Sequence, residues 1–470
     1  MGDERPPTTG DRFHAEETVI EAAAGRPVTA PDDAVAPRTG GEGGPLRKLA
    51  ALFPPGTVPV AAALLVTGLT AYAFLAVANR ALNADQYDSV SVLWALVFLL
   101  GPGLFIPIEQ EVGRAIAHRR SLGQGWTPIV RRAAQVAAAF AVLLTIVALA
   151  ANAPLRQHLF AHQWMVLIGL ILGVDGYAME HLLRGTLAGT GRFAAYGWVF
   201  GTESVLRLVG AVGLWIVGTK TAGPFGFVVG ICPLIAVLLV GRHQREGLLE
   251  PGPEAQLPEI SQNLGLLLAA SIGNFGLMNC TPVAARLLTH GGANNAGTML
   301  NGLLIARVPL FFFQAVQAAL LPNLAKMAAE RRFAEFRDDL RKLFVVVAAI
   351  AVLGVLGCLA IGPWVVDTLF PSKQVLSRYD LALLALGSAA VMVGIVTSQG
   401  SISLGAHRDA AIGWLGGLVV FVAACALPGA VLTRVTWAFL LGTVSAAITL
   451  TVLMVKRVRA AHPTPSPART

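Results

Sequence analysis

The heptapeptide Arg192-Phe-Ala-Ala-Tyr-Gly-Trp198 has a second copy, Arg408-Asp-Ala-Ala-Ile-Gly-Trp414, that agrees with it at five of seven positions. Each copy follows an apolar segment that is long enough to cross a membrane. The first copy follows the fourth such segment and the second follows the tenth, so both halves enter the membrane from the same face. We therefore expect two parallel repeats related by an axis along the membrane normal, an arrangement that binds substrate between its halves.

The composition is that of a polytopic membrane protein. Of the 470 residues, 55% are apolar and 13% are charged, and the mean hydropathy is +0.66. A soluble domain carries about 25% charged residues, whereas one membrane-spanning helix uses roughly 20 apolar residues. Charges, Pro or Gly bound twelve apolar segments, which are 58–79, 89–110, 133–151, 164–183, 195–217, 222–240, 264–284, 297–320, 343–366, 381–403, 410–431 and 435–455.

The distribution of Lys and Arg predicts the orientation of these spans. With the N-terminus inside, 26 of these residues fall in cytoplasmic segments and seven in outer segments, which follows the positive-inside rule. We expect a multi-pass membrane protein with both termini in the cytoplasm. The predicted organisation begins with a disordered acidic tail (1–57) and a first lobe (58–240). A cytoplasmic linker (241–263), a second lobe (264–455) and a basic tail (456–470) follow.

Three stretches resemble the multidrug/oligosaccharidyl-lipid/polysaccharide (MOP) exporter superfamily. Asn79-Arg-Ala-Leu-Asn-Ala-Asp-Gln-Tyr-Asp88 is similar to the turn after the first helix of that superfamily, although Asn83 and Asp88 replace two glycines. Arg307-Val-Pro309, followed by Leu321-Pro-Asn-Leu324, resembles an element of the lipid II and Wzx-type flippases. Gly101-Pro-Gly-Leu-Phe-Ile-Pro-Ile-Glu-Gln-Glu-Val-Gly-Arg114 looks like the end of the second span in actinobacterial polysaccharide biosynthesis proteins.

This resemblance implies an all-α fold of twelve transmembrane helices, in two six-helix bundles around a V-shaped cavity, as in MATE-like transporters. It implies a flippase in a bacterial plasma membrane that moves a polyprenyl-pyrophosphate-linked oligosaccharide from the inner to the outer leaflet by alternating access. Lipid II flippases commonly carry two further C-terminal helices, whereas only a short tail follows Val455 here. That difference favours a polysaccharide precursor as the substrate. Glycan-assembly enzymes are candidate partners, and no nucleic acid is expected.

Charged residues inside the spans are the candidate substrate-binding residues, because such groups usually face a bundle interior or a wet cavity. Arg307 lies about mid-way through the eighth span. A guanidinium binds phosphate oxygens through two parallel hydrogen bonds, so Arg307 is a candidate headgroup ligand; a structural pair with a carboxylate is the alternative. Glu203 and Arg207 are four residues apart in the fifth span, where they either pair with each other or line the cavity.

The remaining candidates are acids near the cytoplasmic ends of two spans. Asp175 and Glu180 in the fourth span are candidates for a proton or cation site, with a satisfied structural acid as the alternative for Asp175. Glu109, Glu111 and Arg114 end the second span. They form either a cytoplasmic gate or a solvated cluster at the interface.

Two other classes of function compete with the flippase. A multidrug or cation antiporter on the same fold would favour a cavity rich in carboxylates. A membrane glycan polymerase or glycosyltransferase would have a large outer loop with catalytic side chains, but the predicted outer connections here are short. We find no phosphate-binding Gly loop, nucleophile triad or metal-ligand spacing, so we expect a transporter without a cofactor or a metal, and not an enzyme.

Overall fold

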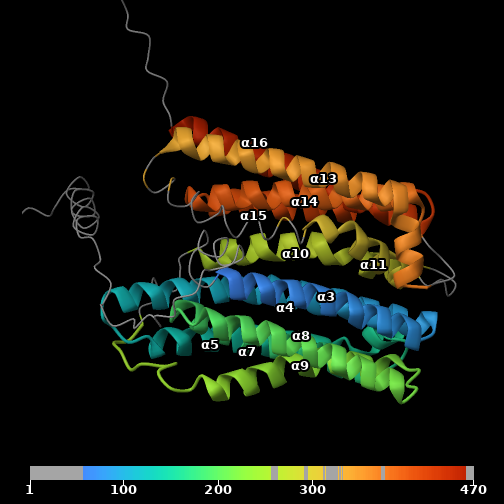
Figure 1. The fold of residues 1–470 in the computed structure, drawn as a ribbon, viewed down its shortest axis with the longest axis horizontal. Coiled ribbons are helices and arrows are strands. Elements are labelled where there is room, and N and C mark those ends of the chain that lie inside the picture. Colours follow the sequence, from blue (N-terminus) through green and yellow to red (C-terminus); the bar gives the residue numbers. More distant parts are fainter. Residues whose placement is uncertain are drawn as a thin grey trace, which may run out of the picture. The chain divides into compact units, whose positions relative to one another are not determined.

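The computed structural model describes residues 57–255, 263–289, 295–310, 332–371 and 376–461, together with the single residues 313, 327 and 330. Within these ranges the chain is all-helical and forms no strand, and its helices run side by side along one direction (Figure 1). The helices are α3 (Thr57–Ala81), α4 (Ala84–Ser121), α5 (Thr127–Ala150), α6 (Asn152–Pro154), η1 (Leu155–Leu159), α7 (Trp164–Gly189), α8 (Phe193–Ile216), α9 (Ala222–His243), α10 (Leu264–Leu287), α11 (Asn295–Ala306), α13 (Phe333–Leu369), α14 (Arg378–Ser403), α15 (His407–Ala424) and α16 (Val431–Ala461).

Ten of the described helices are long and apolar enough to cross a membrane. The sequence predicts twelve spans, and α11 and α15 are the two outside this set. Most of the eighth predicted span beyond α11 lies outside the described residues. Helix α15 has only 18 residues, and it begins with His407, Arg408 and Asp409, which lower its apolar content. The two differences therefore follow from a partly described span and from a short, charged helix start.

The helix boundaries follow from local capping and turn chemistry. The Asn83 side chain accepts a hydrogen bond of 3.0 Å from the Gln86 N–H at the start of α4, and Ser377 caps α14 in the same way through the Asp380 N–H at 3.1 Å. Such N-caps satisfy backbone donors that the helix leaves unpaired. At 38 residues, α4 is longer than a span requires, and it contains Pro102 and Pro107.

Corresponding helices of the two halves are separated by slightly fewer residues along the chain than the two copies of the heptapeptide are. Helices α7 and α14 have 26 residues each, and the interval from the start of α7 to the start of α14 equals that from α8 to α15. The connecting turns are separated by the same interval. Gly191 and Gly405 in these turns have φ values of 77° and 72°, in the left-handed region that glycine adopts without steric cost.

The seven-residue sequence match is therefore two residues out of structural register. Arg192 is the N-cap of α8, whereas Arg408 lies inside the first turn of α15. Trp198 is 69% exposed and Trp414 is 2% exposed, so the two tryptophans occupy different faces of their helices. The prediction of a duplication was correct, but the register that suggested it was wrong, because side-chain identity in an Ala- and Gly-rich segment does not fix which face a residue occupies.

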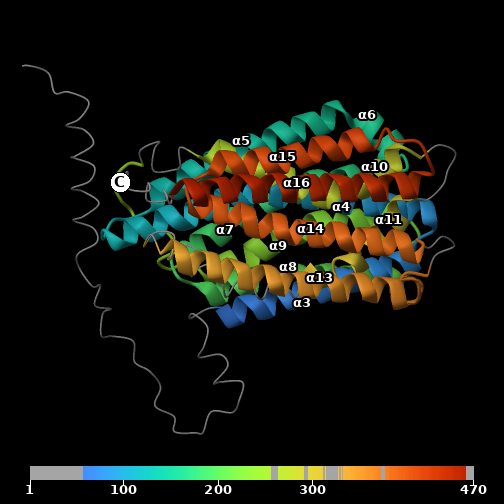
Figure 2. The same ribbon diagram turned by 90° about the horizontal axis from the view of Figure 1, so that it is seen from above.

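Helix packing shows the duplication directly. In the first half, α3 packs on α8, α4 on α7, α5 on α7, α7 on α9, and α8 on α9; in the second half, α10 packs on α15, α11 on α14, α13 on α14, α14 on α16, and α15 on α16. Each of these five pairs in the first half thus has its counterpart six spans later. The halves meet where α4 packs on α10 and α11. Figures 1 and 2 show α4 and α10 as neighbours.

Candidate functional site

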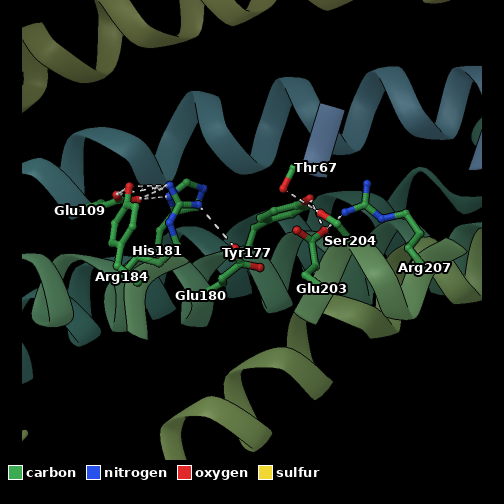
Figure 3. Close-up of polar contacts among 10 residues, drawn as sticks. Thr67, Glu109, Tyr177, Glu180, His181, Arg184, Glu203, Ser204 and Arg207 are labelled. Atoms are coloured by element: carbon green, nitrogen blue, oxygen red, sulfur yellow. Dashed lines mark hydrogen bonds and ion pairs between the residues drawn. The ribbon is translucent and has the colours of Figure 1, made fainter. Parts of the chain in front are cut away.

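Three helices of the first half enclose a network of buried charged side chains (Figure 3). Glu109 of α4 is its centre. One oxygen of Glu109 lies 2.6 Å from His181 Nδ1 and 3.1 Å from Arg184 Nη2, and the other accepts a hydrogen bond of 2.7 Å from the Tyr196 hydroxyl. Arg184 also donates to Glu180 Oε1 at 3.4 Å. The network therefore joins α4, α7 and α8.

A second buried cluster continues along α7 and α8. Glu203 and Arg207 form an ion pair, as their four-residue spacing predicts, and the Tyr177 hydroxyl donates to Glu203 at 2.8 Å. The Arg207 guanidinium lies 5.1 Å from the ring centroid of Trp94 and 5.5 Å from that of Phe98. These aromatic faces attract a cation, so Arg207 is held by one carboxylate and two rings of α4.

The geometry of α7 explains why these side chains converge. Tyr177, His181 and Arg184 are separated by four and three residues, which places them on one helix face. Gly185 lets α4 approach that face closely, because a Cβ at this position would lie 2.7 Å from the Glu109 carbonyl oxygen. A larger residue at 185 would push α4 away and separate Glu109 from its partners.

Several polar atoms of this network are buried and have no hydrogen-bond partner among the residues that the structure describes. They are Glu180 Oε2, His181 Nε2, Arg184 Nε and Arg207 Nε. Glu180 is 0% exposed and His181 is 1% exposed. A buried polar atom without a partner costs about 1–3 kcal/mol, so the network has unused capacity for binding a ligand, a water molecule or a proton.

Arg307 lies apart from this network, immediately after α11. Its Nη2 atom is buried and has no hydrogen-bond partner in the described part of the chain. Among the described residues its side chain forms neither an ion pair nor a hydrogen bond, so the structural pairing considered for Arg307 is not found there. The Tyr72 hydroxyl of α3 donates to the Leu304 carbonyl, one turn before Arg307, at 2.5 Å. This bond joins the first half to the helix that carries Arg307.

The other predicted site residues lie elsewhere. Asp175 is half-buried and accepts a hydrogen bond of 3.3 Å from Thr145 of α5, away from the network that contains Glu180. Glu111 pairs with Arg114 on α4 at 2.8 Å. Glu109 was grouped with them as one cluster, but residues two positions apart point to nearly opposite sides of a helix. The structure accordingly separates Glu109 from the Glu111–Arg114 pair.

Sequence reasoning missed His181, Tyr177 and Tyr196. The spacing of Tyr177, His181 and Arg184 was a visible signal, because three polar side chains on one face of an apolar span require a buried partner. That partner, Glu109, is distant in the sequence and belongs to another helix. Only the packing of α4 on α7 brings them together.

Asp88 was also missed as a functional candidate, and it lies at the predicted outer end of the interface between halves. Its carboxylate accepts hydrogen bonds from the Gly297 N–H at 2.7 Å and the Ala296 N–H at 3.3 Å, at the start of α11. Arg286 of α10 lies 3.6 Å from the same carboxylate. A carboxylate at a helix N-terminus is stabilised by the unpaired N–H groups and the helix dipole.

Further contacts join the halves near the same end. The Tyr87 hydroxyl donates to Asn301 Oδ1 at 2.5 Å. Arg80 of α3 donates to the Leu369 and Thr368 carbonyls of α13 at 2.7 and 2.9 Å. Together with Asp88, these bonds hold the predicted outer ends of α3 and α4 against the second half.

No group of three or more His, Cys, Asp or Glu side chains is arranged to hold a metal ion in the part of the chain that the structure describes. The buried network instead alternates carboxylates with guanidiniums and phenols. Such an arrangement can stabilise buried charge.

The fold is that of the MATE transporters of the MOP superfamily. An inward-facing MATE family multidrug resistance transporter superposes with a TM-score of 0.67 at 16% identity, covering 84% of this chain and 95% of the other. An outward-facing one gives 0.63 at 15% identity, covering 86% and 95%. A mutant MATE transporter of Vibrio cholerae gives 0.64 at 14% identity, covering 88% and 98%. This fold, together with ten described helices that are long and apolar enough to cross a membrane, supports a multi-pass membrane protein.

The sequence is also similar to two uncharacterized proteins of Mycobacterium tuberculosis. The first is 27% identical over 394 residues, which cover 82% of this chain and 88% of the relative. The second is 25% identical over 400 residues, covering 83% and 89%. No family model matches the chain.

Proposed function

We propose that this protein is a flippase that moves a polyprenyl-pyrophosphate-linked oligosaccharide from the inner to the outer leaflet of a bacterial plasma membrane by alternating access. Both termini lie in the cytoplasm in this proposal. The MATE-like fold supports a transporter with a substrate path between two lobes. The motif at Arg307 and the stretch Gly101–Arg114 support a glycan-lipid substrate, because they resemble elements of lipid II and Wzx-type flippases and of polysaccharide biosynthesis proteins.

Arg307 is the observation that carries this proposal. A cation buried in a membrane is normally paired, yet its guanidinium has a buried Nη2 without a partner and no carboxylate partner among the described residues. An anionic substrate would supply the missing charge. A pyrophosphate fits that role, because guanidinium forms two parallel hydrogen bonds with phosphate oxygens.

The membrane potential favours outward movement of such a substrate. Each negative charge that leaves an inside-negative cell releases about 2.3 kcal/mol per 100 mV. The hydrogen bonds of Asp88, Tyr87 and Arg80 between the halves support a conformation that is closed at the outer end. In this conformation the substrate headgroup would enter from the cytoplasmic leaflet, and those contacts would open to release it outside.

A multidrug or cation antiporter is the second candidate. The solved structures with this fold are described as MATE transporters, and the three carboxylates of the buried network suit cation binding. Efflux of cationic dyes from cells that express the protein would favour this candidate, whereas dye retention equal to that of the empty vector would favour the flippase.

Deletion of the gene followed by complementation tests the proposal. We expect the deletion strain to accumulate a lipid-linked saccharide on the cytoplasmic leaflet, and the wild-type gene to reverse the accumulation. Arg307→Ala should fail to reverse it, while Arg131→Ala, which removes an exposed arginine of α5, should succeed. Membrane levels of both variants are measured by immunoblot. Normal complementation by well-expressed Arg307→Ala would contradict the assigned role of Arg307.

A further inference from the structure

The linker that follows α9 is fastened to the loops at one end of the first half. The distribution of Lys and Arg predicts that this end is cytoplasmic. Residues 244–255 accept hydrogen bonds there through several of their backbone carbonyls. Trp126, in the connection between α4 and α5, donates from Nε1 to the Leu248 carbonyl at 2.9 Å. Arg192, in the turn between α7 and α8, donates to the Gln244 carbonyl at 2.9 Å.

A cavity of about 350 Å³ lies where the linker meets these two connections. The side chains that line it include Arg120, Gln124, Trp126, Thr190, Arg192 and Glu250. The linker also contributes Gly247, whose φ is 60°, and a Cβ at this position would lie 3.1 Å from Arg192 Nη2. A side chain at 247 would therefore crowd that guanidinium. Binding pockets for small molecules begin at about 300 Å³, so the cavity has room for a headgroup or a small ester.

Positive charge predominates in this cavity. Arg120 and Arg192 face one carboxylate, that of Glu250, and none of the three forms an ion pair with another described residue. Arg120 donates one hydrogen bond, of 3.2 Å, to the Gly189 carbonyl, and its guanidinium lies 6.0 Å from the Trp126 ring centroid. A guanidinium has five N–H donors. Arg120 therefore keeps donors for a ligand, and one added negative charge would balance the cavity.

We propose that this cavity binds a phosphate group. The exposed Arg120 would donate to its oxygens, because guanidinium and phosphate form parallel hydrogen bonds. Arg192 would add a second positive charge, and the Gln124 amide a neutral donor. The phosphate belongs either to an anionic phospholipid of the cytoplasmic leaflet or to a soluble phosphate ester. This site goes beyond the proposed function, because it does not depend on which substrate the protein moves.

A phosphate in this cavity would join the linker to the first half. It would bind Arg192, which also donates to the Gln244 and Glu246 carbonyls of the linker. The linker leads to α10, which begins at Leu264, and is thus the covalent connection between the halves. A ligand stabilises the conformation that binds it. The bound phosphate would therefore hold residues 244–255 more firmly against the first half.

Two probes distinguish the sources of the phosphate group. The first is inorganic phosphate, titrated by calorimetry into the purified full-length protein in detergent without phospholipid. The second is phosphatidylglycerol, whose retention is measured by mass spectrometry of the intact protein released from mixed vesicles with phosphatidylcholine. A soluble ester predicts that only phosphate binding depends on Arg120. A lipid headgroup predicts that retention of phosphatidylglycerol depends on Arg120.

Arg120→Gln is the main test variant. It should weaken binding of at least one probe about ten-fold or more, because it removes hydrogen bonds between charged groups. Arg131→Gln is the matched control, since Arg131 is an exposed arginine near the start of α5 that does not line the cavity, and it should bind both probes as the wild type does. The inference is overturned if neither probe distinguishes Arg120→Gln from the wild type, or if Arg131→Gln weakens binding equally.

Glu250→Gln gives a change of opposite sign. Removal of the carboxylate that repels an anion should strengthen binding at least about two-fold, and more so at low salt. Glu250 holds the linker through its backbone carbonyl, which accepts from the Thr127 hydroxyl at 2.8 Å, so the substitution leaves this bond in place. Misfolding does not tighten binding. Weaker binding in Glu250→Gln would mean that the ligand is not held as an anion, against the proposal.

Hydrogen exchange of backbone amides measures the effect on the linker. The probe that binds should slow exchange in residues 244–255 at least about five-fold in the wild type, and should have no such effect in Arg120→Gln. Residues 207–216, at the other end of α8, are the internal reference and should exchange equally with and without the probe. Binding that leaves the exchange of residues 244–255 unchanged would place the phosphate outside this cavity and overturn the inference. Slower exchange in a protein that translocates no glycan lipid would refute the proposed function and support this site.

Discussion

The two halves of the molecule have the same helix packing, but their buried side chains differ in charge at corresponding positions. In the structural register that aligns Gly191 with Gly405, the four charged residues of α7 and α8 in the buried network have uncharged counterparts. Glu180 corresponds to Gly394, Arg184 to Ser398, Glu203 to Gly417 and Arg207 to Phe421. A fold that forms in the second half without these charges does not require them in the first.

The second half fills the corresponding space with helix backbone and aromatic rings. A Cβ at Gly417 would lie 2.7 Å from the Gly442 carbonyl oxygen of α16, and a Cβ at Gly394 would lie 2.7 Å from the Trp414 ring. Buried ion pairs are often no more stabilising than apolar residues of similar volume. The charges of the first half therefore indicate a function that the second half, with uncharged residues at these positions, does not share.

The largest expected effect comes from leaving one buried charge unpaired. Arg207→Phe, which copies the second half at one position, should destabilise the protein by about 3–5 kcal/mol, because Glu203 loses its counter-charge. The double variant Glu203→Gly/Arg207→Phe should recover most of that loss. Unfolding titrations in mixed micelles measure both. A double variant as unstable as the single one would show that the first half needs charges to fold.

The second prediction addresses the close packing of the second half. Gly417→Ala should cost about 1–3 kcal/mol, because overpacking of a tight helix contact is destabilising and its nearest neighbours include the Gly442 backbone. Gly416→Ala is the matched control, since a Cβ at 416 meets nothing within 4 Å and Ala favours a helix by about 0.5–1 kcal/mol. Equal stabilities for the two variants, from the same titrations, would contradict the rigid packing of α15 on α16.

The third prediction concerns the contact between the halves. Asp88→Asn should weaken the bond to the start of α11 by about 1 kcal/mol, because a neutral amide interacts less with the helix N-terminus and with Arg286. The outer end should then open more often. Thiol labelling of a cysteine placed at Asn301, which bonds Tyr87 across the interface, should become faster in Asp88→Asn. Unchanged labelling would mean that Asp88 does not hold the halves together.

The smallest effect is expected at Asp175. Asp175→Asn should change stability by no more than about 0.5 kcal/mol, because substitutions outside buried networks are usually within that range and asparagine can still accept the hydrogen bond from Thr145. Complementation of the deletion strain should remain normal. A loss of complementation would place Asp175 in the transport machinery and would weaken the contrast between the network and its surroundings.

Most of the fold could be predicted from the sequence, because apolar length and Lys/Arg placement are local signals. The register of the repeat was the exception. The correct register aligns Gly191 with Gly405, which lie in corresponding turns of the two halves. The heptapeptide match instead aligns Arg192 with Arg408, two residues away from that register. The predicted lobe boundaries remain predictions.

The candidate site was less accessible to sequence reasoning. The Glu203–Arg207 pair was predictable from a spacing of four residues within one helix. The partnership of Glu109 with His181 was not, since it depends on which face of α4 meets α7 and on the close approach that Gly185 permits. In the sequence, Asp88 only replaces a glycine of the superfamily turn that it resembles. The position of α11 in the structure shows that its carboxylate accepts hydrogen bonds at the start of that helix.

The central claim is that the charges of the first half serve transport and not folding. Its most direct test is the triple variant Glu109→Gln/Glu180→Gln/Arg184→Gln, which neutralises the network at nearly constant volume, assayed for unfolding and for substrate translocation in one reconstituted preparation. The account predicts a free energy of unfolding within about 1 kcal/mol of the wild type together with loss of translocation. A variant that fails to fold, or one that translocates at the wild-type rate, would contradict it.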